Sequence, residues 1–310
     1  MISKNKAFSL IELSIVVLII GILISGVTQG SRLIKASKLQ TAKTLTLSSD
    51  VNSIKDLAMW LETSLDNSVT IDSSSTVTRW NDINPQSMSK INAYNTIPGG
   101  PVYVENVING LPVIQFYLES EIPANQRFGE RITVDPNGLG LSFLANTNYT
   151  IFVVEQRVSS GSLDGKNSMF LSGHGLISPS INLQIGYSSG KNFIWDHTGV
   201  TTAVKDASDW NIPVTLSAAI TPRIHTFKFD TTKGKYYSMK SNISAPYSAT
   251  NADAIGKPLV SYYGAAIGGM SSGSEDLSIA EMIIFTRALS TDEIKSVEAY
   301  LGKKYAIKIS

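Results

Sequence analysis

A single carboxylate, Glu12, stands inside a run of twenty otherwise apolar or small residues that extends from Phe8 to Val27. A carboxylate within a membrane helix costs about 2.5 to 3.5 kcal/mol on insertion scales, so it generally has a partner or a purpose. Two interpretations of Glu12 follow. It has a partner or a functional purpose, or it extends to the membrane interface near the positive end of the helix dipole.

The element that must position Glu12 is a helix over the whole run. Twenty helical residues span about 30 Å, which matches the hydrocarbon thickness of a bilayer, so the run is predicted to cross a membrane. The seven residues before it include Lys4 and Lys6 and leave no room for an ordinary secretory signal. Taken alone, the cations after the run would not keep the N-terminus in the cytoplasm. These cations are Arg32, Lys35, Lys38 and Lys43.

The start of the chain resembles a known class of signal. The basic leader, Ala7, Phe8 and the sequence Leu10-Ile11-Glu12 are similar to the class III signal of type IV pilins and type II secretion pseudopilins. The resemblance implies cleavage between Ala7 and Phe8 by a prepilin peptidase, followed by methylation of the new Phe8 amine. It also implies that Glu12 pairs with the Phe8 amine of a neighbouring pilin subunit during filament assembly. The family usually has Gly where this chain has Ala7.

The same resemblance implies a location. The precursor is expected to cross the inner membrane once, with a cytoplasmic N-terminus, a periplasmic C-terminal domain and lipid around the helix before assembly. It is then expected to enter a pilus or pseudopilus at the cell surface. We place this topology above the cation count, because long downstream domains translocate largely regardless of charge.

Composition limits the remaining classes. The chain has 310 residues, of which 43% are hydrophobic and 16% charged, and its net charge is +1. This hydrophobic content predicts a packed core, and the charge gives no reason to expect a nucleic acid partner. The chain has no cysteine, so an exported domain must be stabilised by burial alone, without disulfides or a thiolate metal site.

Three parts are expected along the chain: a prepilin leader over 1–7, a pilin-type helix over 8–55 and a β-sandwich over 56–310. Serines and threonines between 41 and 53 weaken helix propensity, so the helix is expected to end before Asp56. Beyond the membrane we expect one apolar helix face. That face comprises Leu33, Ala36, Leu47, Val51 and Ile54.

From about Leu57 the pattern changes to short runs of alternating apolar residues separated by Gly, Asn, Asp, Ser and Pro. A dozen such runs without intervening helices predict a large, mainly antiparallel sandwich, so the fold class is α+β. Thr232-Lys233-Gly234 reads as a hairpin turn. The predicted strands are 57–61, 77–80, 102–104, 113–116, 149–154, 169–171, 181–185, 193–195, 224–229, 236–239, 265–267 and 279–285.

Both ends of this region resemble bacterial concanavalin A-like (laminin-G-like) jelly-roll domains. At the start the similar segments are 56–61, 77–82 and 110–116; at the close they are 279–285 and 287–290, followed by a helix ending near Tyr305. Ser290 and Glu293 predict a capping box for that helix. Its apolar face, which includes Val297 and Leu301, is expected to pack on the sandwich.

The resemblance leaves three activities open: carbohydrate binding, protein binding or glycan hydrolysis. Hydrolysis needs two carboxylates about 5 to 9.5 Å apart, which related glucanases place in a dense Glu-x-Asp-x-Glu motif. The chain has no such motif, and we interpret Glu275, Asp276 and Glu281 as loop and surface acids. The histidines lack a nucleophile motif or ligand spacing: they are His174, His197 and His225, the last expected in the core. We therefore expect no enzyme activity.

Ligand binding remains as the activity of the domain. Aromatic rings in loops can stack on sugars, while Asp and Asn side chains satisfy hydroxyls or hold calcium. The alternative is that these aromatic side chains cap the sandwich core; Trp60 and Trp80 are expected there. The ligand candidates are Trp195, Asp196, Asp206, Asp209, Trp210, Tyr262 and Tyr263.

These observations predict a pilin-like filament subunit, in the minor class, that displays a lectin-like domain for adhesion to a glycan or host protein. No cofactor is expected, with calcium left open. The first alternative is a type II secretion pseudopilin whose sandwich contacts secreted protein. The second is a membrane-anchored glycan hydrolase.

Overall fold

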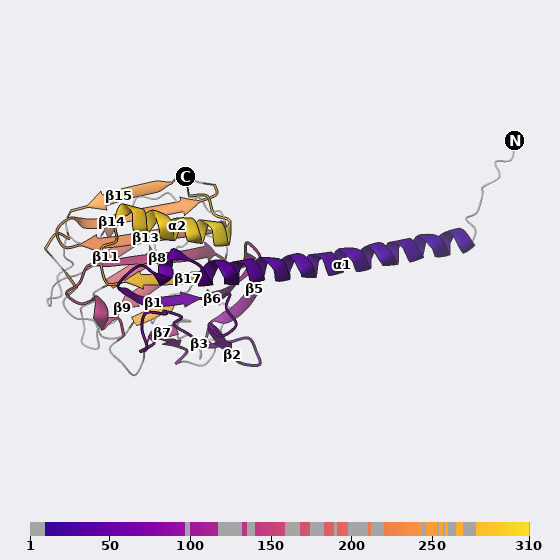
Figure 1. The fold of residues 1–310 in the computed structure, drawn as a ribbon, viewed down its shortest axis with the longest axis horizontal. Helices are drawn as coiled ribbons and strands as arrows, with labels where there is room; N and C mark the ends of the chain where they lie inside the picture. The colour runs from indigo at the N-terminus through magenta and orange to yellow at the C-terminus, as the bar shows by residue number, and fades with distance from the viewer. Residues whose placement is uncertain are drawn as a thin grey trace.

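The computed structural model is shown in Figure 1. It describes residues 10–96, 100–116, 132–134, 140–158, 168–173, 183–188, 191–197, 210–211, 220–243, 246–252, 254–256, 258–259, 265–268 and 277–309. Two antiparallel sheets form a sandwich, and one long helix projects far from it. A second helix lies beside the base of the first.

The projecting helix, α1, comprises the 38 residues Leu10–Leu47 and is followed by a short 3-10 turn, η1, at Asp50–Asn52. The large apolar side chains from Leu10 to Ile34 are 48 to 85% exposed, and an 18-residue window has mean hydropathy 2.7. The helix is thus long and apolar enough to cross a membrane. It ends where the side-chain amide of Asn52 donates to carbonyl groups of the last turn, including that of Leu47 at 3.0 Å.

The apolar face predicted for the second half of α1 is partly wrong. Leu33 and Leu47 are 71% and 70% exposed, and Ala36 is exposed too. The helix is buried against the sandwich near its end, where Ala42 and Thr46 are its buried residues. Small side chains are needed there because another helix lies against this turn. Val51 and Ile54, beyond the helix, are buried as expected.

The first sheet, sheet A, has eight strands within the described residues, and seven of them follow the order β15-β14-β13-β8-β17-β6-β5. The eighth, β1, pairs with β17. The strands are β1 Leu57–Glu62, β5 Val102–Ile108, β6 Leu111–Phe116, β8 Tyr149–Arg157, β13 Arg223–Asp230, β14 Gly234–Ser241, β15 Tyr247–Asn251 and β17 Leu277–Phe285.

The second sheet, sheet B, has nine strands in the described part of the chain, in the order β12-β11-β10-β9-β16-β7-β4-β3-β2. A one-turn 3-10 helix, η3 at Ser142–Leu144, precedes β8 of the other sheet. The strands are β2 Val69–Ile71, β3 Val77–Trp80, β4 Ala93–Tyr94, β7 Ile132–Val134, β9 Ser168–Gly173, β10 Leu183–Ser188, β11 Lys191–His197, β12 Trp210–Asn211 and β16 Ala265–Gly268.

Strand β17 shows why the sandwich has two cores. All nine of its residues are buried, because the strand is covered on both faces. Met282 and Ile284 belong to the core between the sheets. Ile283 and Phe285 belong to a second core on the outer face of sheet A, which contains residues of both helices. A register shift against β8 at 279–281 changes which residues of β17 face the inner core and which face the outer core.

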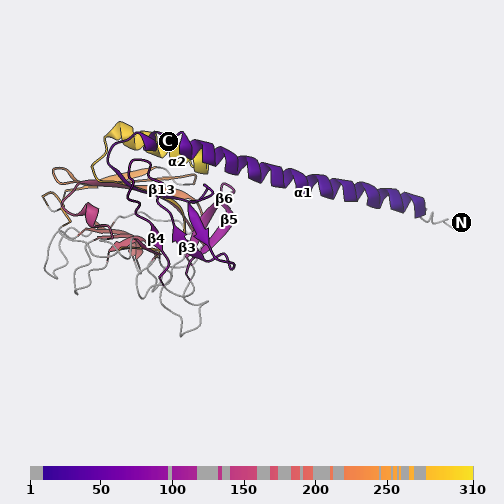
Figure 2. The ribbon, with the colours of Figure 1, turned by 60° about the horizontal axis from the view of Figure 1, so that its bottom comes forward.

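The second helix, α2 at Thr291–Tyr305, begins with the predicted capping box. The Ser290 hydroxyl accepts from the Glu293 amide at 3.3 Å, and the Glu293 carboxylate accepts from the Ser290 amide at 2.8 Å. Val297 and Leu301 are buried against the sandwich, as expected. Figure 2 shows α2 and the end of α1 on the outer face of sheet A, with sheet B on its other side.

Each of the twelve predicted strands overlaps an observed strand, and the predicted hairpin turn joins β13 to β14, where Gly234 has φ +84°. Five of the described strands were not predicted from the sequence, namely β2, β4, β7, β12 and β15. Four of these have two or three residues, which is too short for an alternating pattern to be recognised. The fifth, β15, alternates half-buried with exposed residues and has one large apolar side chain, Tyr247.

Candidate functional site

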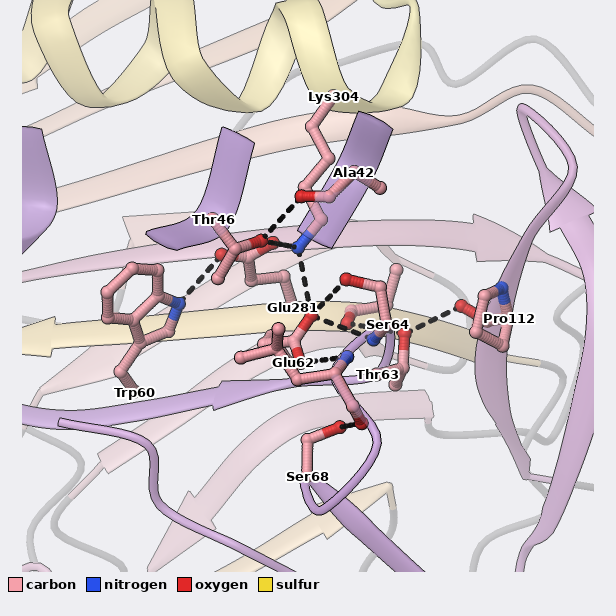
Figure 3. Close-up of polar contacts among 12 residues, drawn as sticks. Ala42, Thr46, Trp60, Glu62, Thr63, Ser64, Ser68, Pro112, Glu281 and Lys304 are labelled. Atoms are coloured by element: carbon pink, nitrogen blue, oxygen red, sulfur yellow. Dashed lines mark hydrogen bonds and ion pairs between the residues drawn. The ribbon is translucent and has the colours of Figure 1, made fainter. Parts of the chain in front are cut away.

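A buried polar cluster that joins several elements lies where α1 ends on the sandwich (Figure 3). At its centre, Lys304 of α2 points inward, and its ammonium group is 2.9 Å from Glu62 Oε2 of β1 and 2.8 Å from Glu281 Oε2 of β17. The same nitrogen donates to Thr46 Oγ1 of α1 at 2.7 Å. We call the cluster of Thr46, Glu62, Glu281 and Lys304 the joint, since it connects both helices to sheet A.

The joint is closed to solvent, and its carboxylates have further donors. Glu281 Oε1 accepts from Trp60 Nε1 at 2.7 Å and from the Tyr300 hydroxyl at 2.8 Å, while Oε2 accepts from the Tyr305 hydroxyl at 2.9 Å. Glu62 accepts from the amide and hydroxyl of Ser64 and from the Leu65 amide. Buried charges are stabilised only when paired and hydrogen-bonded in this way.

The charges of the joint fix its protonation. Burial alone would raise the pKa of Glu62, but Lys304, the Ser64 hydroxyl and the Leu65 amide outweigh burial and lower it. Burial alone would lower the pKa of Lys304, but the charges of Glu281 and Glu62 outweigh burial and raise it. The joint therefore contains one cation facing two acidic side chains, with hydroxyl and indole donors around them.

Local sequence explains how α1 reaches this cluster. Thr46 satisfies its own helix by donating to the Ala42 carbonyl at 3.0 Å, which turns its oxygen toward Lys304. Ala42, one turn earlier, is small enough to lie under α2. From α2, Tyr300 and Lys304 enter together because residues four apart share a helix face.

The β5–β6 hairpin secures the same region from the side. Its turn is Asn109-Gly110, both with positive φ, as a two-residue hairpin favours. The Asn109 amide donates to the Lys304 carbonyl at 3.0 Å, and Lys38 of α1 donates to Asn109 Oδ1 at 3.4 Å. This hairpin therefore contacts both helices.

The joint corrects one interpretation of the sequence. Glu281 was expected to be a surface acid, yet it is 1% exposed and bonded to four side chains. A signal was present in α2: Lys304 follows Val297 and Leu301 by seven and three residues, on the apolar face of that helix. A lysine at such a position predicts a buried partner. Trp60 and Trp80 are buried as expected.

A second buried cluster lies inside the sandwich and contains His225. Glu155 Oε1 of β8 accepts from the Tyr187 hydroxyl of β10 at 2.7 Å and lies 3.0 Å from His225 Nε2. Burial lowers the pKa of His225, which favours the neutral ring. Burial would raise the pKa of Glu155, but His225 and the Arg223 charge outweigh burial. His225 is thus a core histidine, as predicted, that contacts a residue linking the two sheets.

The described structure brings three of the predicted ligand residues, Trp195, Asp196 and Trp210, onto two paired strands, but it does not form an exposed aromatic site from them. Trp195 is fully buried, its indole donates to the Tyr149 hydroxyl at 3.2 Å, and its ring packs on Phe227. Its selection as an exposed sugar-stacking residue is therefore wrong, because β11 turns this side chain into the core. Asp196 lies on β11 and Trp210 on β12, which pair. The remaining candidates lie outside the described residues: Asp206, Asp209, Tyr262 and Tyr263.

The assembly residues are described only in part. Glu12 lies in the first turn of α1 and is exposed. Ala7 and Phe8 lie outside the described residues, as do Glu275, Asp276 and His174. Over the described ranges, no group of three or more His, Asp or Glu side chains could hold a metal ion.

These features define a class of protein: a helix-anchored β-sandwich in which a long apolar helix is fastened to the domain it carries. Residues 2–28 match the family model for the prokaryotic N-terminal methylation motif. The chain therefore begins with an N-terminal methylation motif of the pilin type, joined to a β-sandwich. The motif implies processing by a prepilin peptidase and assembly with other pilins. No curated protein matches the sequence.

Solved structures are similar to the sandwich. The botulinum neurotoxin serotype D binding domain has 14% identity and a TM-score of 0.50 over 82% of this chain and 53% of its own. The binding domain of Paraclostridial Mosquitocidal Protein 1 has 13% identity and a TM-score of 0.49, covering 80% and 52%. A Trypanosoma rangeli sialidase has 15% identity and a TM-score of 0.49 over 81% of this chain and 33% of its own. This chain thus spans a third to about half of their lengths, and such identities show the fold alone.

Proposed function

We propose that the chain is a pilin-like filament subunit, in the minor class, that carries a lectin-like domain for adhesion. One observation supports this most strongly. An apolar helix with a methylation motif extends from the sandwich, and its large apolar side chains from Leu10 to Ile34 are about half exposed or more. A surface of this kind is stable only in lipid or packed against similar helices. The motif implies both surroundings: lipid before assembly, and similar helices in the filament afterwards.

In the proposed assembly, the peptidase cuts between Ala7 and Phe8 on the cytoplasmic face of the inner membrane, while the sandwich lies in the periplasm. The Phe8 amine is then methylated. Glu12 pairs with the Phe8 amine of a neighbouring subunit, which compensates the cost of an acid in an apolar helix. The joint transmits this position to the sandwich, because Thr46 of α1 is hydrogen-bonded to Lys304, and Lys304 in turn pairs with Glu62 of sheet A.

The proposed work of the sandwich is binding rather than catalysis. A botulinum neurotoxin domain that shares the fold is a binding domain, and the dense acidic motif of jelly-roll glucanases is missing from this sequence. The ligand would be a glycan or a host protein. The remaining candidates, now without Trp195, are Asp196, Asp206, Asp209, Trp210, Tyr262 and Tyr263.

Mass spectrometry of the N-terminus, on protein sheared from the cell surface, tests the proposal. The expected mature chain begins at Phe8 and carries one added methyl group. A chain that begins at Met1 and is missing from sheared fibres would contradict the proposal. A processed chain found only in the periplasm would indicate a secretion pseudopilus instead. Ala7→Leu is expected to leave the precursor uncut.

A glycan array tests the domain. Binding of a defined glycan without release of sugar is expected. Release of sugar from the array would indicate a hydrolase instead. Tyr262→Ala and Trp210→Ala are expected to weaken binding if these loops form the site. Ser248→Ala on β15, the edge strand of sheet A, is the matched control.

A further inference from the structure

A groove lies between α1 and the β5–β6 hairpin, at the membrane end of the sandwich. It has a volume of about 530 Å³, within the range of small-molecule sites. Its two walls are joined by a hydrogen bond from Lys38 on α1 to Asn109 Oδ1 in the hairpin turn. The lining residues are Val27, Gly30, Ser31, Ile34, Lys35 and Lys38 of α1, with Asn106 and Gly110 of the hairpin.

The groove begins where the membrane span ends. Val27 is the last residue of the twenty-residue apolar run, and Lys35 is eight residues further, a rise of about 12 Å. The headgroup layer adds roughly 5 to 7 Å to each side of the hydrocarbon. Helical side chains lean toward the N-terminus, so Lys35 extends back toward that layer. A Cβ added at Gly30 would meet nothing within 4 Å, which leaves the floor open.

The charge of the groove is positive. The sequence has no Asp or Glu between Glu12 and Asp50. Among the described residues, Arg32, Lys35 and Lys38 have no carboxylate within salt-bridge distance, whereas Lys43, further along, pairs with Asp66. An anionic oxygen group could form ion pairs with Lys35 and Lys38. Val27 and Ile34 offer apolar surface to methylene groups beside it.

We propose that this groove binds the headgroup and glycerol region of an anionic phospholipid while the chain is in the membrane. The apolar surface of Val27 and Ile34, Lys35 extending back toward the headgroup layer and Lys38 one turn behind it fit a molecule with a phosphate joined to acyl chains. The inference rests on the membrane helix of the proposed function, and adds a lipid partner that acts before assembly.

The test uses the full chain in detergent with equal amounts of phosphatidylglycerol and phosphatidylcholine, and native mass spectrometry counts the bound lipid. Each lysine near an anionic surface contributes a factor of about five, so the expected preference for phosphatidylglycerol is about 25-fold. Lys35→Gln with Lys38→Gln is expected to abolish it. Lys295→Gln with Lys303→Gln removes two exposed cations from α2 and is expected to keep it.

A further variant separates a groove from diffuse charge. Ser31→Trp fills the groove and retains every cation, so it is expected to lower retention of phosphatidylglycerol at least fivefold. Equal retention of both lipids by the wild type, or full retention by Ser31→Trp, would overturn the proposal. The proposal would also be overturned if Ser31→Cys formed disulfide-linked dimers that bind no lipid, because a second copy of the chain would then occupy the groove.

The two proposals can fail separately. A chain that is cut at Phe8 and recovered in fibres, yet shows no lipid preference, overturns the lipid site and leaves the filament subunit intact. A chain that binds phosphatidylglycerol but is neither cut nor incorporated does the reverse.

Discussion

Replacement of Lys304 by Met is the most direct test of the joint. Met has a similar length and shape but has no charge and no donor. The change leaves Glu62 and Glu281 buried without their cation, and it removes the hydrogen bond to Thr46. Removing one partner of a buried ion pair costs about 3 to 5 kcal/mol of unfolding free energy.

The structure sets where in that range the loss should fall. Glu281 keeps donors from Trp60, Tyr300 and Tyr305, and Glu62 keeps donors from Ser64 and Leu65. These donors stabilise the remaining charges, so we expect the lower half, about 3 to 4 kcal/mol. For a domain of this size, that lowers the melting temperature by roughly 6 to 16 °C.

The assay is urea unfolding of the full chain in detergent, followed by tryptophan fluorescence. Trp60 donates to Glu281 and reports directly on the joint. Lys303→Met is the matched control, because its side chain is the exposed neighbour, and it is expected to change stability by less than about 0.5 kcal/mol. Adding Glu62→Gln and Glu281→Gln to Lys304→Met should recover part of the loss. A loss below about 1 kcal/mol for Lys304→Met would refute the reasoning.

Four further predictions follow from the structure. Glu62 has a lowered pKa and Lys304 a raised one, so the stability that the joint contributes should fall as pH drops through the Glu62 pKa and as pH rises through the Lys304 pKa. This contribution is measured as the difference in melting temperature between wild type and Lys304→Met across pH. A difference that stays constant with pH would contradict the prediction. Ser290→Ala removes the cap of α2 and should cost about 1 kcal/mol in urea unfolding. Gly268→Ala should cost at least about 2 kcal/mol, because φ is +103° and the new Cβ would lie 2.2 Å from Phe116; Gly256→Ala, with φ +72° and open space, should lose less. Glu12→Ala should insert into the membrane normally yet reduce incorporation into sheared fibres, measured by immunoblot, while the nearby Ser14→Ala should assemble normally; equal fibre amounts would exclude the pairing role.

Much of the fold could be predicted from local pattern. The long apolar helix follows from one apolar run, and strands such as Ile224 to Phe229 follow from alternation. The start of α2 and its N-terminal cap follow from Ser290 and Glu293. These features depend on residues close in sequence, so their periodicity identifies them.

The joint could not be predicted in the same way. Its members come from 46, 62, 281 and 304, and alternation assigns Glu281 to an exposed face unless a helix is known to cover that face. Trp195 fails for a related reason: its loop-like surroundings gave no sign that Phe227 and Tyr149 would enclose its ring. Contacts between distant segments decide both cases.

The chain reverses direction between α1 and β1, and this has a mechanical consequence. In Figure 1, β1 runs back along the axis of α1, so tension applied to the helix arrives at the first residue of the strand. Such a load would break the pairing of β1 with β17 one residue pair at a time, starting at Leu57. The bond between Thr46 and Lys304 lies upstream of that point. A fibre under traction would therefore load the joint first and spare the sheet until the joint opens.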